Sequence, residues 1–111
     1  MAVRDDAVFK IKSDFLKALA HPARLQIIEY LKDGEASVGK LVHVLGVEQS
    51  SLSRHLAVLR ELGLLESRQE RTTVYYKLRD DDIFKILRPV AEVLRKKLRR
   101  SEKLLESLGK E

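Results

Sequence analysis

The stretch from Val47 to Gly63 constrains the fold most, because it has the pattern of one short amphipathic helix. At about 100° per residue, three leucines lie within about 60° of one another and form an apolar stripe: Leu52, Leu56 and Leu59. The opposite side holds small side chains and one guanidinium, from Ser50, Ser53, Arg54 and Ala57. Hydroxyl and guanidinium groups hydrogen-bond to phosphates and base edges in a DNA major groove. The stretch therefore predicts either a recognition helix or an ordinary surface helix, and its neighbours decide between them.

Residues 5–33 predict the first two helices. Residues 5–19 place apolar side chains at helical spacing. Pro22 begins a second helix, because proline suits the first helical position, and Gly34 ends it. We expect the second helix to bury a stripe formed by Leu25, Ile28 and Leu31.

The two helices of residues 37–63 form a recognisable motif. Ser37 is suited to cap a short helix that Gly46 ends, and the candidate recognition helix follows after a turn of about two residues. Two short helices joined by a tight glycine turn, the second with a polar outer face, are typical of a helix-turn-helix.

Residues 64–79 change to a β-type pattern. Leu64–Gln69 and Thr73–Leu78 predict two strands, and Glu70, Arg71 and Thr72 join them with Arg71 near the tip of the hairpin. The tip has no glycine, which leaves its turn type open. A hairpin directly after a helix-turn-helix is a wing, so the fold class is mainly α with a small β-hairpin (α+β), a winged helix-turn-helix.

Residues 80–108 return to a helical period. Their apolar stripe comprises Ile83, Leu87, Val90, Leu94, Leu98, Leu105 and Leu108. Pro89 predicts a kink or two consecutive helices here. A single domain spanning 1–111 leaves so long a stripe little to pack on, so we expect a homodimer formed through the first and last helices.

The net charge of +5 and the pI near 9.6 favour polyanionic partners. The strongest basic block, residues 85–103, holds eight basic and two acidic residues and lies outside the recognition helix. Its Arg95, Arg99 and Arg100 either form a solvated outer face of the last helix or contact an anion, which would be a DNA phosphate or a small-molecule effector.

Several classes of protein are excluded by what the chain lacks. It has no cysteine, and hence no disulfide and no thiolate metal site. Neither an apolar run of membrane-spanning length nor an export signal is visible, from which we expect no membrane partner and a cytoplasmic location. No nucleophile, carboxylate pair or phosphate loop occurs at catalytic spacing, so we expect no enzyme.

Three segments carry a family resemblance in their order and spacing. LKALAHPARLQIIEYL (16–31), QSSLSRHLAVLRELGLL (49–65) and VYYKL (74–78) resemble the ArsR/SmtB family of winged helix-turn-helix regulators, over about residues 12–88. The resemblance implies a homodimer that binds an inverted repeat in a promoter, usually represses it, and releases the DNA when an inducer binds.

The same resemblance implies the residues that contact DNA. Those in the recognition helix would be Gln49, Ser50, Ser53, Arg54 and His55, and Arg71 would be the wing arginine on the backbone or in a minor groove. His55 lies beside the apolar stripe, so its alternative role is to fix the helix on the core. His21, before Pro22, is expected to be structural at a helix junction.

The chain departs from the metal-sensing members of the family. The helix before the recognition helix offers only His43, and the last helix contains no histidine, whereas zinc requires about four N, S or O ligands. We therefore expect no metal site and no cofactor. The functional prediction is a repressor that binds double-stranded DNA without responding to metal. The alternative is a winged-helix interaction or nucleoid-associated module with non-specific DNA affinity.

Overall fold

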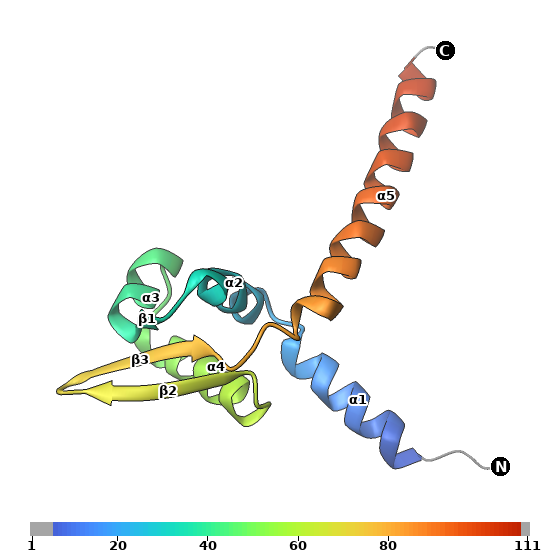
Figure 1. The fold of residues 1–111 in the computed structure, drawn as a ribbon. Helices are drawn as coiled ribbons and strands as arrows, with labels where there is room; N and C mark the ends of the chain where they lie inside the picture. The colour runs from blue at the N-terminus through green and yellow to red at the C-terminus, as the bar shows by residue number, and fades with distance from the viewer. Residues whose placement is uncertain (1–5, 110–111) are drawn as a thin grey trace. The chain divides into compact units, whose positions relative to one another are not determined.

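The computed structural model describes residues 6–109 as two compact units, one ending at Arg79 and the other starting at Asp80 (Figure 1). The first unit contains α1 (Asp6–Leu19), α2 (Pro22–Tyr30), the 3-10 turn η1 (Leu31–Asp33), β1 (Ala36–Ser37), α3 (Val38–Leu45), α4 (Gln49–Glu61), β2 (Leu65–Glu70) and β3 (Thr73–Leu78). The second unit contains α5 (Phe84–Gly109). This order confirms the predicted fold class, mainly α with a small β-hairpin.

Local signals set the ends of the short helices. The Nδ1 atom of His21 accepts a hydrogen bond from the backbone N–H of Ala23 and caps α2, next to Pro22 in the first helical position. Ser37 Oγ accepts from the backbone N–H of Lys40 and caps α3. Gly46 ends α3 with φ of 65°, a left-handed conformation that favours glycine. The predicted roles of Ser37 and Gly46 are confirmed.

The sheet has a third strand that the sequence did not predict. Its order is β1-β3-β2, all antiparallel, and β1 pairs Ala36 with Tyr76 and Ser37 with Tyr75. The wing hairpin itself was predicted, and its register pairs Leu65 with Leu78 at the base. β1 has two residues, which is too short to show an alternating pattern.

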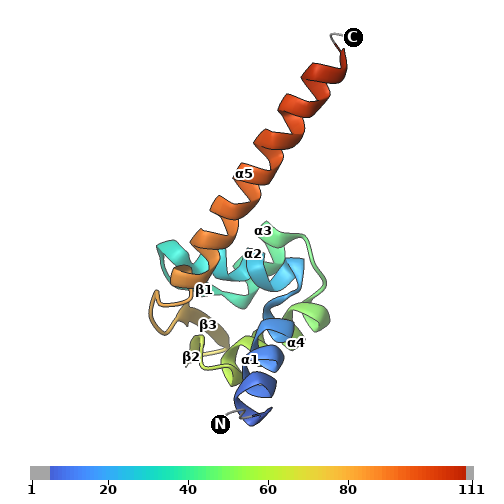
Figure 2. The same ribbon diagram turned by 90° about the vertical axis from the view of Figure 1, so that its right-hand side faces the viewer.

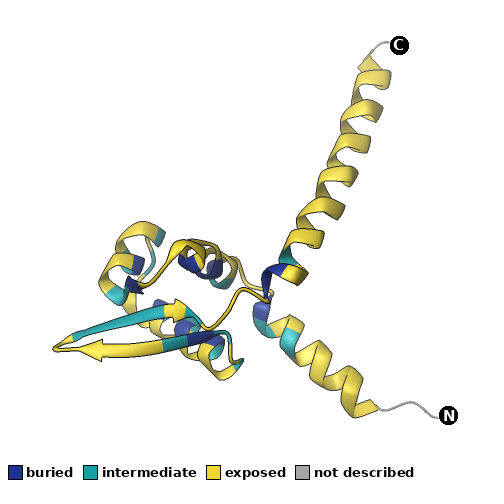
Figure 3. Ribbon diagram, in the orientation of Figure 1, coloured by how far each residue is buried: buried dark blue, intermediate teal, exposed yellow. Residues whose placement is uncertain are grey.

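The core of the first unit lies where α2, α3 and α4 pack together. The predicted stripe of α4 is confirmed, since Leu52, Leu56 and Leu59 are buried (Figure 3). The predicted stripe of α2 was partly wrong, because Leu25 is exposed and Ile27 is buried in its place. Packing against both α3 and α4 centres the buried face of α2 on Ile27 and its neighbour Ile28.

In the second unit α5 is one helix and not the two consecutive helices that were an alternative at Pro89 (Figure 2). Pro89 is only the sixth residue of α5, so little helix precedes the carbonyl group that loses its donor. The backbone N–H of Asp82 donates to Oδ1 of Asp80 in the turn before the helix. Among residues 6–109, no helix combines the length and the apolar character needed to cross a membrane.

Both terminal helices expose apolar side chains. On α1 the most exposed are Phe9 and Ile11, at 65% and 68%. On α5 the exposed set comprises Ile86, Val90, Val93, Leu94, Leu98, Leu104, Leu105 and Leu108. Figure 3 shows both helices exposed along most of their length.

Candidate nucleic-acid interface

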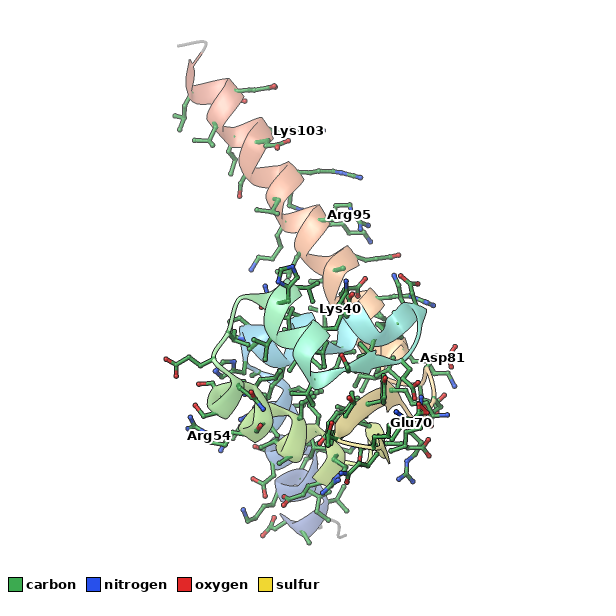
Figure 4. All side chains as sticks on the ribbon, turned by 90° about the vertical axis from the view of Figure 1, so that its left-hand side faces the viewer. Lys40, Arg54, Glu70, Asp81, Arg95 and Lys103 are labelled. Atoms are coloured by element: carbon green, nitrogen blue, oxygen red, sulfur yellow. The ribbon has the colours of Figure 1, made fainter. Side chains whose placement is uncertain are left out.

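The outer face of α4 carries four of the predicted site residues. Gln49, Ser50, Ser53 and Arg54 are all exposed. Ser50, Ser53 and Arg54 lie away from the buried leucines, and Gln49 is the first residue of the helix. Figure 4 shows Arg54 projecting from the outer side of α4. The Arg54 side chain has no hydrogen-bond or ion-pair partner within residues 6–109. This face is low, polar and basic, which suits close approach to a polyanion.

The wing presents Arg71 at its tip. A two-residue turn of Arg71 and Thr72 joins the paired residues Glu70 and Thr73. Arg71 has φ of 59°, in the left-handed region that favours glycine, and its backbone carbonyl accepts a hydrogen bond from Gln69 Nε2 at 3.1 Å. The guanidinium is exposed and therefore available for a contact outside the chain.

An ion pair holds the outer face of the wing. The Nε and Nη2 atoms of Arg68 donate to the two carboxylate oxygens of Glu35, each at 2.8 Å, and its guanidinium lies 4.4 Å from the centroid of the Tyr75 ring. The hydrogen bond from Arg68 lowers the pKa of Glu35, and the same bond raises the pKa of Arg68. This pair links the wing to the residue just before β1, and so positions the wing.

The sequence did not predict the ion pair between Arg68 and Glu35. The cross-strand pairing of Arg68 with Tyr75 follows from the hairpin register and was open to prediction. Glu35 lies 33 residues from Arg68, and no local pattern connects them.

A cleft of about 490 Å³ separates the recognition helix from the wing within the first unit. Residues from both sides and from the start of α3 line it, among them Ser37, Gln49, Ser53, Thr72, Thr73 and Tyr76. These side chains carry hydroxyl and amide groups and no formal charge, so they are suited to hydrogen bonding rather than to ion pairing. The cleft brings the predicted residues Gln49 and Ser53 together with the wing.

His55 lies apart from the exposed residues of α4. Its ring is half-buried, its Nδ1 accepts a hydrogen bond from Arg24 Nε at 3.2 Å, and its centroid is 4.4 Å from that of His21. Burial lowers the pKa of His55, and the neighbouring His21, Arg24 and Arg54 lower it further. These contacts fit the alternative role of His55, which is to fix α4 on the core, better than they fit a DNA contact.

The basic block of α5 is solvated. Arg95, Arg99 and Arg100 are exposed and form no ion pair within the described part of the chain. Nor do residues 6–109 bring together three His, Cys, Asp or Glu side chains able to hold a metal ion.

A polar helix after a tight turn, followed by a hairpin with a basic tip, defines the class of winged helix-turn-helix proteins. The profile described as "Bacterial regulatory protein, arsR family" matches residues 21–67. An HTH-type transcriptional regulator of Mycobacterium tuberculosis, Rv0081, is 36% identical over 107 residues, covering 96% of this chain and 94% of the relative. The chain belongs to the arsR family of bacterial transcriptional regulators, which confirms the resemblance seen in its sequence.

Two shorter matches name opposite regulatory effects. The biofilm growth-associated repressor of Agrobacterium fabrum is 43% identical over 72 residues, which cover 65% of this chain and 62% of that protein. The transcriptional activator HlyU of Vibrio cholerae is 48% identical over 68 residues, which cover 61% of this chain and 63% of that protein.

Solved structures agree with the fold. The crystal structure of M. tuberculosis Rv0081 superposes with a TM-score of 0.75 at 38% identity, covering 82% of this chain and 92% of that one. The homodimeric winged helix-turn-helix DNA-binding domain Mb0332 of Mycobacterium bovis, solved by solution NMR, gives 0.71 at 32% identity, covering 88% and 94%.

Proposed function

We propose that this regulator is a homodimer that binds an inverted-repeat operator in double-stranded DNA and represses the adjacent promoter. The observation that supports this most directly is the exposed face of α4 beside a wing tipped by Arg71. Such a pair presents one helix to a major groove and one hairpin to the neighbouring backbone. Repression follows the named function of the A. fabrum relative.

The contacts divide into two kinds. In this proposal Ser50, Ser53 and Gln49, near the start of α4, read base edges, while Arg54 and Arg71 provide charge for phosphate or base contacts. His55 faces Arg24, so we assign it a positioning role in place of the predicted DNA contact.

The exposed apolar faces of α1 and α5 support the dimer. Leu98 and Leu105 on α5 are 65% and 69% exposed, which in water favours burial against a second copy of the chain. The similar winged helix-turn-helix domain Mb0332 is a homodimer. A two-fold axis would place the two recognition helices about 34 Å apart, one turn of DNA.

This function assigns the chain no catalysis and places it in the cytoplasm, where bacterial promoters are found. Nothing in the arrangement of Arg95, Arg99 and Arg100 selects an effector, so we treat these residues as a solvated basic face.

The test is a fluorescence-anisotropy titration against the intergenic DNA upstream of the gene, beside a scrambled duplex, at 50 and 200 mM salt. Operator binding should exceed scrambled binding by about a thousandfold or more. In a promoter–reporter assay, deleting the gene should raise expression.

Equal binding of both duplexes, with equal release as salt rises, would contradict this operator. If selection from random DNA then yielded no preferred site, the non-specific module would replace the repressor. Lower reporter expression on deletion would indicate an activator, the named function of the V. cholerae relative.

A further inference from the structure

Besides the packing of its leucines, the recognition helix is linked by hydrogen bonds of one guanidinium, that of Arg24, to α1 and α2. Arg24, on α2, donates from Nε to His55 Nδ1 on α4 at 3.2 Å and from Nη1 to the backbone carbonyl of Ala18 on α1 at 2.6 Å. Ala18 lies in the last turn of α1, so Arg24 connects the end of one helix to the middle of another.

We call the two hydrogen bonds of Arg24, to His55 and to Ala18, the joint. The direction of the first bond fixes the protonation state of His55 Nδ1. Arg24 is an obligate donor, so His55 Nδ1 must be an unprotonated acceptor. His21 also uses its Nδ1 as an acceptor, from the backbone N–H of Ala23 at the start of α2. Both rings are therefore in an acceptor role on Nδ1, with their centroids 4.4 Å apart.

A proton on His55 Nδ1 would point one donor at another and add a positive charge among cationic groups. The ionisable side chains that face the ring are His21 before α2, Arg24 from α2 and Arg54 from α4 itself. The group that α1 contributes is a backbone carbonyl, which already accepts from Arg24. No carboxylate among the described residues pairs with the imidazole to offset the added charge.

We infer that Arg24 and His55 are positioning residues of the recognition helix, and that protonation of His55 breaks their joint and weakens DNA binding. The inference rests on the proposed function for its DNA readout. Burial and the surrounding positive charge lower the pKa of His55, so the folded joint resists protonation more than the unfolded chain does.

The linkage gives a sign for stability as well. At neutral pH His55 is uncharged in both the folded and the unfolded chain, and the full contribution to stability is present. Below the usual pKa of histidine the unfolded chain binds a proton that the folded state excludes, which favours unfolding. The contribution is lost as the pH falls from that usual value toward the lowered pKa of the folded state.

The expected loss of operator affinity can be calculated because each dimer contains two copies of His55. If both must be neutral in the complex, affinity falls about fourfold when the pH equals the pKa of His55 in the free dimer, and about a hundredfold one unit lower. The midpoint of the loss is thus tied to a quantity that NMR measures separately.

The experiment follows operator affinity by anisotropy from pH 8 to pH 5 at constant ionic strength. The titration of the His55 imidazole is followed by NMR in the free protein. His55→Asn keeps an acceptor in place of Nδ1 but cannot be protonated. His55→Gln is a second variant that cannot be protonated, and its amide group reaches the position of Nε2 instead. His43→Gln, at an exposed histidine on α3, is the matched control.

We expect wild-type and His43→Gln affinities to fall together along the curve set by the His55 titration. His55→Asn should bind near wild-type strength at pH 7.5, and neither His55→Asn nor His55→Gln should lose much affinity on acidification. Arg24→Gln should bind more weakly already at pH 7.5, with a reduced pH dependence.

Three results would overturn the inference. These are a flat wild-type profile while His55 titrates, a His55→Asn profile as steep as the wild type, and a uniform loss in both His55 variants at every pH, which would indicate direct DNA contact. Failure of every protein to bind operator at pH 7.5 would refute the proposed function instead. The joint is then tested without DNA, because acidification should lower the wild-type unfolding midpoint more than that of His55→Asn.

Discussion

Replacing Arg71 with glycine should separate the two roles of the wing tip, its backbone turn and its charge. The φ of 59° at Arg71 is unfavourable for a residue with a Cβ atom by about 1 to 2 kcal/mol. Glycine relieves that strain but adds about 0.5 to 1 kcal/mol of unfolded-state entropy. These terms nearly offset each other, so we expect the Tm of Arg71→Gly to stay within about 4 °C of the wild type.

The loss of charge should appear in the salt dependence of operator binding. A dimer of Arg71→Gly lacks two cationic contacts, which reduces the slope of log K against log salt concentration by about 1.8. The wild-type advantage over the variant should therefore shrink about tenfold between 50 and 200 mM salt.

The assay is an anisotropy titration at four or more salt concentrations, with thermal unfolding of the same samples. Arg71→Lys is the control, because lysine keeps both the charge and the unfavourable φ, and its slope should match the wild type. An unchanged slope in Arg71→Gly would refute the phosphate contact. A fall in Tm of more than about 8 °C would refute the expectation that relief of the φ strain offsets the added entropy of glycine in the unfolded chain.

Three further substitutions test other parts of the interface. Arg54→Ala should weaken operator binding by roughly 1 to 3 kcal/mol for each half-site that Arg54 reads, with unchanged Tm; equal weakening on scrambled DNA would make it a phosphate contact. Glu35→Gln should remove the ion pair between Glu35 and Arg68 and leave Arg68 paired with Glu70 alone, which should lower operator affinity a few-fold with an unchanged salt slope. Wild-type affinity would show that this ion pair does not position the wing. Leu98→Glu should shift the protein toward monomer in sedimentation velocity and reduce operator affinity, whereas an intact dimer would place the interface elsewhere.

Local sequence signals predicted most of the helical structure. Pro22, Ser37 and Gly46 act within a turn of their own positions, so their effects on helix ends are visible without knowledge of the fold. The 3.6-residue period likewise separated the buried leucines of α4 from the exposed Ser53 and Arg54. These features depend on neighbours along the chain and not on distant packing.

The errors and omissions share a different cause. Leu25 has the right spacing for the core, but packing of α2 against two other helices selects Ile27. The two-residue strand β1 exists because β3 offers it a partner, a pairing between residues about forty positions apart. Arg71 takes a positive φ without being glycine, since the paired strands on either side impose the turn.

By itself, the sequence determined the order of the helices and the wing hairpin, the face of α4 that is exposed and the absence of cysteine. Tertiary structure alone decided which side chains hold that face in place. Arg24 meets His55 across 31 positions and Arg68 meets Glu35 across 33, and neither pair has any periodic signature. Contacts of this kind depend on where the folded backbone brings two distant residues, and a pattern of neighbours along the chain contains no such distance.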